Sequence, residues 1–156
     1  MPKFSELFLN TKIDIKSILD IKFSYTTTVA YTLFKNLGEN GRVAYTLSEL
    51  FIDIPYAIIY GYTYAFLVIF LLKRNKIKNL NYLISAPLLI SFFDILENTG
   101  IIIMLTKYPE KLSSICNLTS IFTSLKWIFA IITFIIILIN LSYLLISKLF
   151  IKKYNL

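Results

Sequence analysis

The sequence predicts an all-α integral membrane protein, a helical bundle with three spanning helices and an N-terminal amphipathic helix. Hydrophobic residues make up 57% of the 156 residues and charged residues only 16%, with a mean hydropathy of +0.71. Such a composition is typical of membrane proteins, and several apolar runs are long enough to cross a bilayer. We therefore expect a single membrane domain over residues 1–156, with no room for an extra globular domain.

The N-terminal segment, residues 1–43, differs from the rest because charges interrupt every apolar run. It contains no stretch of about 18 apolar residues and no pattern of a cleaved secretory signal. Between Tyr25 and Gly38, apolar residues recur at helical spacing and predict an amphipathic helix on the extracytoplasmic membrane surface. Packing of this helix onto the spans is the alternative. The apolar positions are Ala30, Leu33, Phe34 and Leu37, and Glu39-Asn40-Gly41 predicts a following turn.

Three later segments, at about residues 48–72, 80–106 and 118–147, are predicted to span the membrane. The first is free of charge from residue 54 to 72, about 28 Å of helix. The second contains Pro87, which predicts a kink. The third has Trp127 near its start, where an aromatic residue is expected to lie at the membrane interface.

Cations beside the spans predict the orientation of the protein. Loop 73–79 carries four Lys or Arg residues, and three lysines follow the third span. By the positive-inside rule, this loop and the C-terminus are cytoplasmic in a multi-pass protein. The net charge of +7 then favours contact with membrane lipid, and we expect no nucleic-acid partner.

Two residue types exclude many kinds of chemistry. The chain has no histidine and a single cysteine, Cys116, which removes His-ligated metals, His general bases and an internal disulfide. It also lacks a phosphate-binding glycine loop and a nucleophile elbow. We expect no cofactor and no metal centre, and the catalytic residues of any reaction stay unknown.

The acidic residues of the second span are the most informative feature of the chain. Asp94, Glu97 and Asn98 are spaced by three and four residues, so they share one helical face. An ionised carboxylate in hydrocarbon costs several kcal/mol, so such groups usually pair with one another or line a cavity. We therefore expect a polar pocket, and counting along the span from residue 80 places it in the outer half of the bundle.

Other polar residues are expected to converge on the same leaflet. Asp53 precedes the first apolar run, Lys126 lies near the start of the third, and Arg42 lies nearer the surface. Arg42 and Lys126 are the predicted counter-ions of the acids, and Tyr45 could add a hydroxyl. Because the acids outnumber the bases, we expect one carboxyl to be protonated or to bind an external cation or amine.

Three functions stay open at this point. The pocket would bind a small amphiphile, a lipid or a cation. A membrane enzyme could use the paired carboxyls for acid–base chemistry on a lipid-like substrate. In a structural or accessory subunit, the same groups would hold helices together, and a second copy or another membrane protein would complete the bundle.

A pattern of residues extends from Asp20 to Trp127. In this pattern, GExGR…Y…D…DxxEN…KW, the chain resembles a family of small, poorly characterised four-helix membrane proteins. The resemblance implies the bundle architecture and the same polar residues, without an activity. The family pattern places a spanning helix before the Tyr25 region, and this sequence shows none there. The matching residues are Tyr25, Leu37-Gly38-Glu39-Asn40-Gly41-Arg42, Tyr45, Asp53, Pro55, Pro87, Asp94-Ile95-Leu96-Glu97-Asn98, Thr123 and Lys126-Trp127.

Overall fold

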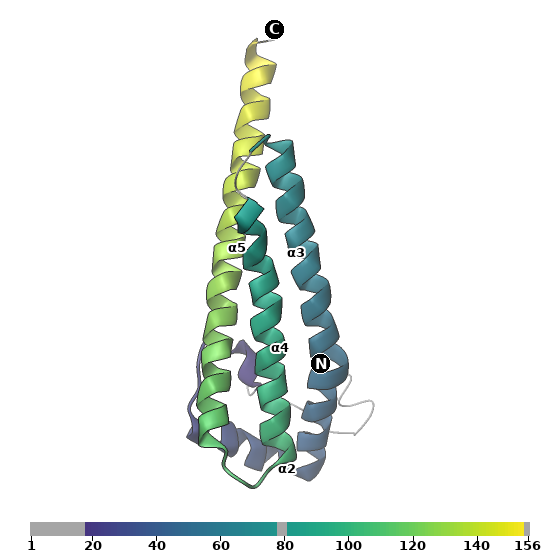
Figure 1. The fold of residues 1–156 in the computed structure, drawn as a ribbon, viewed down its shortest axis with the longest axis vertical. Coiled ribbons are helices and arrows are strands. Elements are labelled where there is room, and N and C mark those ends of the chain that lie inside the picture. Colours follow the sequence, from purple (N-terminus) through teal and green to yellow (C-terminus); the bar gives the residue numbers. More distant parts are fainter. Residues whose placement is uncertain (1–17, 78–80, 155–156) are drawn as a thin grey trace.

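Three long helices run side by side in the computed structural model, which describes residues 18–77 and 81–154 (Figure 1). They are α3 (Ile54–Arg74), α4 (Ser85–Thr106) and α5 (Ser113–Tyr154), and α2 (Thr27–Ser48) lies at the end of the bundle where α4 and α5 are joined. The described part of the chain contains helical elements and no strand. The predicted all-α bundle is therefore confirmed.

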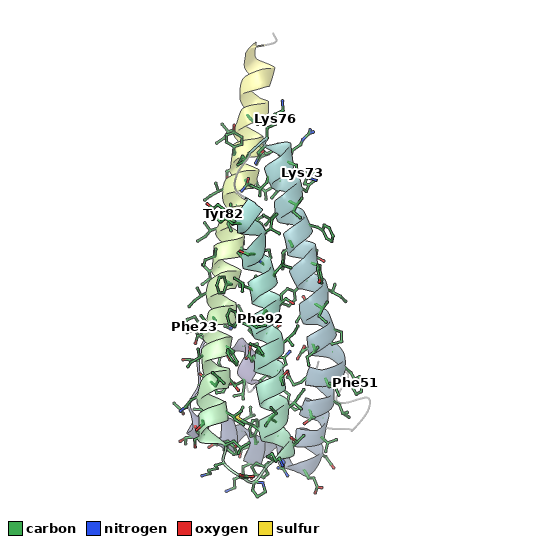
Figure 2. All side chains as sticks on the ribbon, viewed as in Figure 1. Phe23, Phe51, Lys73, Lys76, Tyr82 and Phe92 are labelled. Atoms are coloured by element: carbon green, nitrogen blue, oxygen red, sulfur yellow. The ribbon has the colours of Figure 1, made fainter. Side chains whose placement is uncertain are left out.

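Large apolar side chains project outward along the length of the bundle (Figure 2). Phe51, Tyr82 and Phe92 are more than half exposed, and so are many aliphatic side chains of α5. A soluble protein rarely exposes so much continuous apolar surface, whereas a bilayer provides the apolar surroundings that it needs. Three helical segments are long and apolar enough to span a membrane, at Thr27–Arg74, Tyr82–Thr106 and Ser113–Ser147. This is the architecture of a multi-pass membrane protein.

A sharp break at Gly38 divides α2 into two arms. Gly38 has φ 65° and ψ −174°, a conformation open to little besides glycine. The first arm buries Ala30 and Phe34 in one apolar cluster with Ile101 and Met104 of α4, so it packs onto the spans. The predicted turn at residues 39–41 is wrong, because the break falls at Gly38 alone and the next residues are already helical.

The second arm of α2 continues into α3 through a π-helical turn, Glu49–Asp53. Pro55 lies in the first turn of α3. Since proline has no N–H to continue the regular i→i−4 ladder, a local change of hydrogen-bond register fits this position. The wider turn brings Glu49 into the bundle, where it is fully buried.

Helix α4 begins at Ser85, after a 3₁₀ turn at Asn81–Ile84, and not at residue 80 as predicted. Pro87 therefore lies in the first turn, where backbone N–H groups have no partner within the helix. The expected kink has no cause there, and that prediction is wrong. Helix α5 begins at Ser113, five residues earlier than predicted, and its 42 residues extend over about 63 Å.

Residues 18–26, which we call the N-terminal strap, run along α5 in the opposite direction. The Lys22 carbonyl accepts a hydrogen bond from Trp127 Nε1 (3.1 Å), and the Tyr25 N–H donates to Ser120 Oγ (2.9 Å). Trp127, predicted to anchor at the interface, thus holds the strap through its indole N–H. The start of the strap lies deepest in the bundle, with Leu19 fully buried.

Candidate functional site

A buried ion triad joins α4 to α5. Lys126 Nζ lies 3.1 Å from Asp94 Oδ1 and 2.5 Å from Glu97 Oε2. The Lys126, Asp94 and Glu97 side chains are only 10%, 12% and 0% exposed. The structure therefore brings these three sequence-predicted site residues into direct contact. A buried ion pair is tolerated only where its remaining polar atoms also find partners.

Hydrogen bonds from three directions complete the ion triad. The Tyr60 hydroxyl of α3 donates to Asp94 Oδ2 (2.6 Å), and Thr123 Oγ1 donates to Glu97 Oε1 (2.8 Å). Lys126 Nζ also donates to the Asp20 carbonyl of the strap (3.3 Å). Thr123 lies three residues before Lys126, which puts both side chains on one face of α5. That spacing was the sequence signal for Thr123.

Asp94 lies near the middle of α4. It follows Ser85 by nine residues, about 14 Å along a helix of about 33 Å. Its partner Lys126 lies 13 residues from the start of α5 and 28 from its end, so the ion triad is nearer to the end of the bundle where α4 and α5 are joined. The predicted position in the outer half of the bundle stays a prediction.

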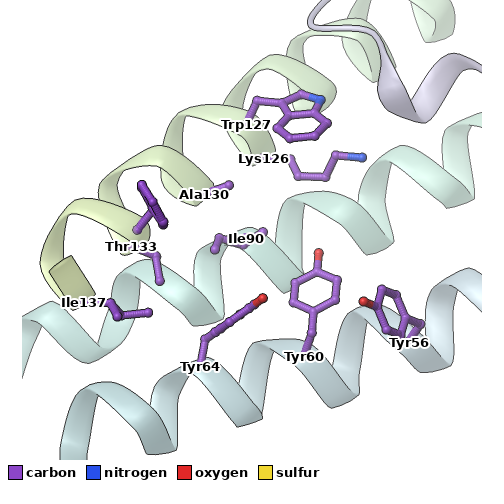
Figure 3. A pocket seen from close by; sticks show the side chains of 10 residues that line it. Tyr56, Tyr60, Tyr64, Ile90, Lys126, Trp127, Ala130, Thr133 and Ile137 are labelled. Carbon is purple, nitrogen blue, oxygen red and sulfur yellow. The ribbon is translucent and has the colours of Figure 1, made fainter. Parts of the chain in front are cut away.

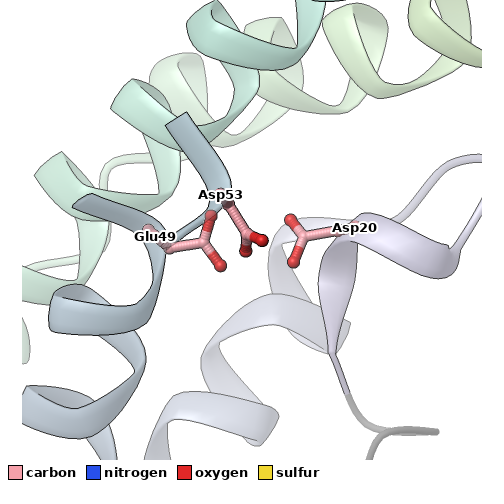
Figure 4. A group of neighbouring side chains, drawn as sticks. All are labelled: Asp20, Glu49 and Asp53. Carbon is pink, nitrogen blue, oxygen red and sulfur yellow. The ribbon is translucent and has the colours of Figure 1, made fainter. Parts of the chain in front are cut away.

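A second cluster, the acidic triad, consists of Asp20, Glu49 and Asp53. One carboxylate oxygen from each lies within 4.8 Å of the others, and Figure 4 shows the three side chains pointing toward one another. Asp53 belongs to the predicted site, and Glu49 lies one helical turn before it in the chain. Asp20 was missed because it lies outside every predicted span. Its flanking residues Leu19 and Ile21 were the available signal, since they place a charge inside a short apolar run.

Asn98 and Tyr45 connect these acids to the rest of the bundle. With its amide oriented to satisfy both ends, Asn98 donates to Glu49 Oε2 (3.0 Å) and to the Asp94 carbonyl (3.2 Å). That orientation is assigned from the hydrogen-bond pattern. The Tyr45 hydroxyl donates to Asp20 Oδ2 (3.3 Å) and accepts from the Leu19 N–H (3.1 Å). Both sequence-predicted residues therefore contact the acidic triad.

Arg42 is the sequence-predicted site residue that the structure places elsewhere. Its guanidinium donates to the Phe34 carbonyl (3.1 Å) and lies 4.1 Å from the centre of the Tyr108 ring. Seven residues of helix, about 10 Å, separate it along α2 from Glu49. The prediction that Arg42 balances the acids is wrong, because its side chain contacts the break in α2 and the α4–α5 connection instead.

The charges of the two clusters do not balance within the described residues. Five carboxyl groups meet there, and Lys126 is the one cation that the described chain brings within ion-pair distance of them. Outside the spans, burial raises the pKa of the Asp20 carboxyl above its ordinary value, although the Lys126 ammonium lowers it. The site is therefore rich in acceptors and short of cations.

A pocket of about 400 Å³ opens beside the ion triad, between α3 and α5 (Figure 3). Its polar end carries Lys126 and the Tyr60 hydroxyl, and the lining becomes apolar toward Ile137, about 16 Å further along α5. Thr133 is 2% exposed and its hydroxyl has no hydrogen-bond partner within the described chain. We call this the tyrosine pocket. It is lined by Tyr56, Tyr60, Tyr64, Ile90, Lys126, Trp127, Ala130, Thr133, Phe134 and Ile137.

Comparison with models of protein families, with curated proteins and with solved structures gives no match to this chain. The resemblance to a four-helix membrane family stays a prediction.

Proposed function

We propose that the protein binds a small amphiphile in the tyrosine pocket, with the polar end of the ligand at the ion triad. The observation that carries the proposal is a cavity of about 400 Å³ with the Lys126 ammonium of the ion triad and the Tyr60 hydroxyl at one end and an apolar lining at the other. Sites for small ligands commonly have volumes of about 300–1,000 Å³, apolar walls and a few placed polar groups. An amphiphile matches both ends.

The polar end favours a neutral or cationic head group over an anionic one. Two carboxyls face one ammonium there, so the ion triad carries a net negative charge when both are ionised. The tyrosine rings add aromatic faces, with Tyr56 and Tyr60 packed edge to face at 5.3 Å and Tyr64 next along the helix. Such faces attract cations. We therefore favour an amine- or hydroxyl-bearing amphiphile.

The ligand would enter from the lipid. Tyr56 and Phe134 line the tyrosine pocket and are each more than 60% exposed on the outer surface of the bundle, which in a membrane is the acyl-chain region. The positive-inside rule favours a cytoplasmic location for the loop 73–79 and the C-terminus. The strap and α2 would then face the extracytoplasmic side.

The test fills the tyrosine pocket without touching the ion triad. In Ala130→Phe the new ring occupies the cavity, and Ile131→Phe places the same ring on the exposed neighbouring position as a matched control. Native mass spectrometry of detergent-purified protein with dodecylamine, dodecanol or dodecanoate added should show the amine or the alcohol bound to wild type and control. Binding should fall at least tenfold in Ala130→Phe. Equal binding in all three proteins would overturn the proposal, provided that their thermal stabilities agree.

One observation favours an acid–base enzyme as the second candidate. The Tyr60 hydroxyl is held 2.6 Å from Asp94 at the wall of the tyrosine pocket, which is the geometry of a proton-transfer pair. An enzyme would convert membrane lipid to a product of changed mass, and Tyr60→Phe would abolish that product while ligand binding persists. Incubation with extracted lipids and mass analysis of the products distinguishes conversion from binding alone.

A further inference from the structure

The acidic triad does not line the tyrosine pocket, and its three carboxyls could bind a different kind of ligand. Its carboxyls come from two separate segments, Asp20 from the strap and Glu49 and Asp53 from the π-helical turn (Figure 4). The nearest ammonium, on Lys126, contacts the backbone carbonyl of Asp20 and pairs with acids of the ion triad. The described ion pairs therefore leave these three carboxyls without a cation.

Unpartnered oxygens inside the acidic triad point to a missing ligand. Glu49 is fully buried, and while its Oε2 accepts from Asn98, its Oε1 has no hydrogen-bond partner in the described chain. The same holds for Asp20 Oδ1 and Asp53 Oδ2. A buried carboxylate oxygen without a donor or a cation is strongly unfavourable. Each of the three side chains thus has an oxygen without a partner, and the acidic triad brings one oxygen of each side chain within 4.8 Å of the others.

The spacing of these oxygens selects among cations. Calcium binds oxygen ligands at about 2.3–2.6 Å, so two ligands on opposite sides lie at most about 5 Å apart. The carboxylate oxygens of the acidic triad lie within 4.8 Å of one another, so one calcium ion could contact all three without a movement of the chain. Magnesium, at about 2.0–2.1 Å, needs opposite ligands near 4 Å and keeps most of its water. An all-carboxylate set also favours hard cations over zinc or copper.

We infer that the acidic triad is a Ca²⁺ site, with one carboxylate oxygen each from Asp20, Glu49 and Asp53. The ion reduces the formal charge of the five carboxyls and Lys126 from −4 to −2. It also ties the strap to the joint between α2 and α3. The expectation of no metal centre rested on the absence of histidine and on the single cysteine, and Asp20 was not placed beside the other two acids.

The test uses the full chain, purified in detergent and stripped with EDTA. Titration with Ca²⁺, followed by isothermal calorimetry and by thermal unfolding, should show one site and a rise in Tm, and Mg²⁺ should bind at least tenfold more weakly. Tb³⁺, a Ca²⁺ analogue, should give tyrosine-sensitised luminescence, because the Tyr45 hydroxyl lies 3.3 Å from Asp20 Oδ2.

Variants test whether the acidic triad, and not another acidic residue, binds the calcium ion. Asp20→Asn and Asp53→Asn should each lower Ca²⁺ affinity at least tenfold and remove the rise in Tm, while Glu110→Gln, on the exposed α4–α5 connection, should bind like wild type. Both Asn variants should fold without added metal, since each removes a negative charge that no cation of the described chain balances. The inference is overturned if wild type shows no Ca²⁺ binding at millimolar concentration, or if the Asn variants bind as tightly as Glu110→Gln.

Discussion

Replacing Lys126 by methionine is expected to lower the free energy of unfolding by about 3–5 kcal/mol, because it leaves two buried carboxylates without their counter-ion. Lys126 contacts Asp94, Glu97 and the Asp20 carbonyl. If these were ordinary hydrogen bonds between membrane helices, at about 0.6 kcal/mol each, the loss would total only about 2 kcal/mol. Methionine retains most of the apolar stem, so lost packing adds little. Reversible unfolding in mixed micelles, titrated with SDS, measures the difference.

The neutral triple variant Lys126→Met/Asp94→Asn/Glu97→Gln is the control for this prediction. It removes all three charges and keeps the approximate side-chain volumes, so most of the stability should return, to within about 2 kcal/mol of wild type. The reasoning is refuted if Lys126→Met alone loses less than about 1 kcal/mol, or if the triple variant is no more stable than the single one.

Four further changes test other parts of the structure by the same unfolding assay. Gly100→Ala should lose about 1–3 kcal/mol, because the added Cβ would lie 2.9 Å from Thr119 Cγ2 and force α4 and α5 apart; an unchanged stability would contradict this close approach. Gly38→Ala should lose a similar amount through backbone strain alone, since nothing lies within 4 Å of the added carbon; no loss would mean that the break lies elsewhere. Tyr60→Phe removes one hydrogen bond to Asp94 and should lose about 0.6–1.7 kcal/mol, and a loss above 3 would not fit a single bond. Burial raises the pKa of Asp20 above its ordinary 3.8, so the folded state binds more protons than the unfolded state above that pH. In EDTA, stability should fall as the pH rises above about 4, and Asp20→Asn should show a shallower fall; parallel profiles would contradict a buried Asp20.

The spans and the ion triad were predictable because both follow from local rules. A bilayer requires about 20 apolar residues per helix, and a three- or four-residue spacing puts side chains on one face whatever the tertiary structure. Asp94 and Glu97 need a counter-ion, and few cations lie near the predicted spans. Lys126 was one of the two counter-ions that we predicted, together with Arg42. The partners of this pair could therefore be found without coordinates.

The acidic triad and the position of Arg42 were not predictable in the same way. Asp20 meets Glu49 and Asp53 only because the strap enters the bundle, and no periodicity links residues so far apart in the chain. The direction of Arg42 depends on the break at Gly38, which turns the first arm of α2 toward Tyr108. The π-helical turn likewise changes the register at a place where the sequence shows only Pro55.

The strap also has a consequence for biosynthesis. It emerges from the ribosome before the three long helices, yet its contacts on α5, at Ser120, Ser124 and Trp127, are about 100 residues later in the chain. Translation at about 5–20 residues per second separates the two by roughly 5–20 seconds. During that interval α3 and α4 are synthesised, while Lys126, the ion-pair partner of Asp94, is still missing. Helix α5 thus completes the packing of a segment that was synthesised long before it, and until Lys126 is made the strap and the acids of α4 lack their shared partner.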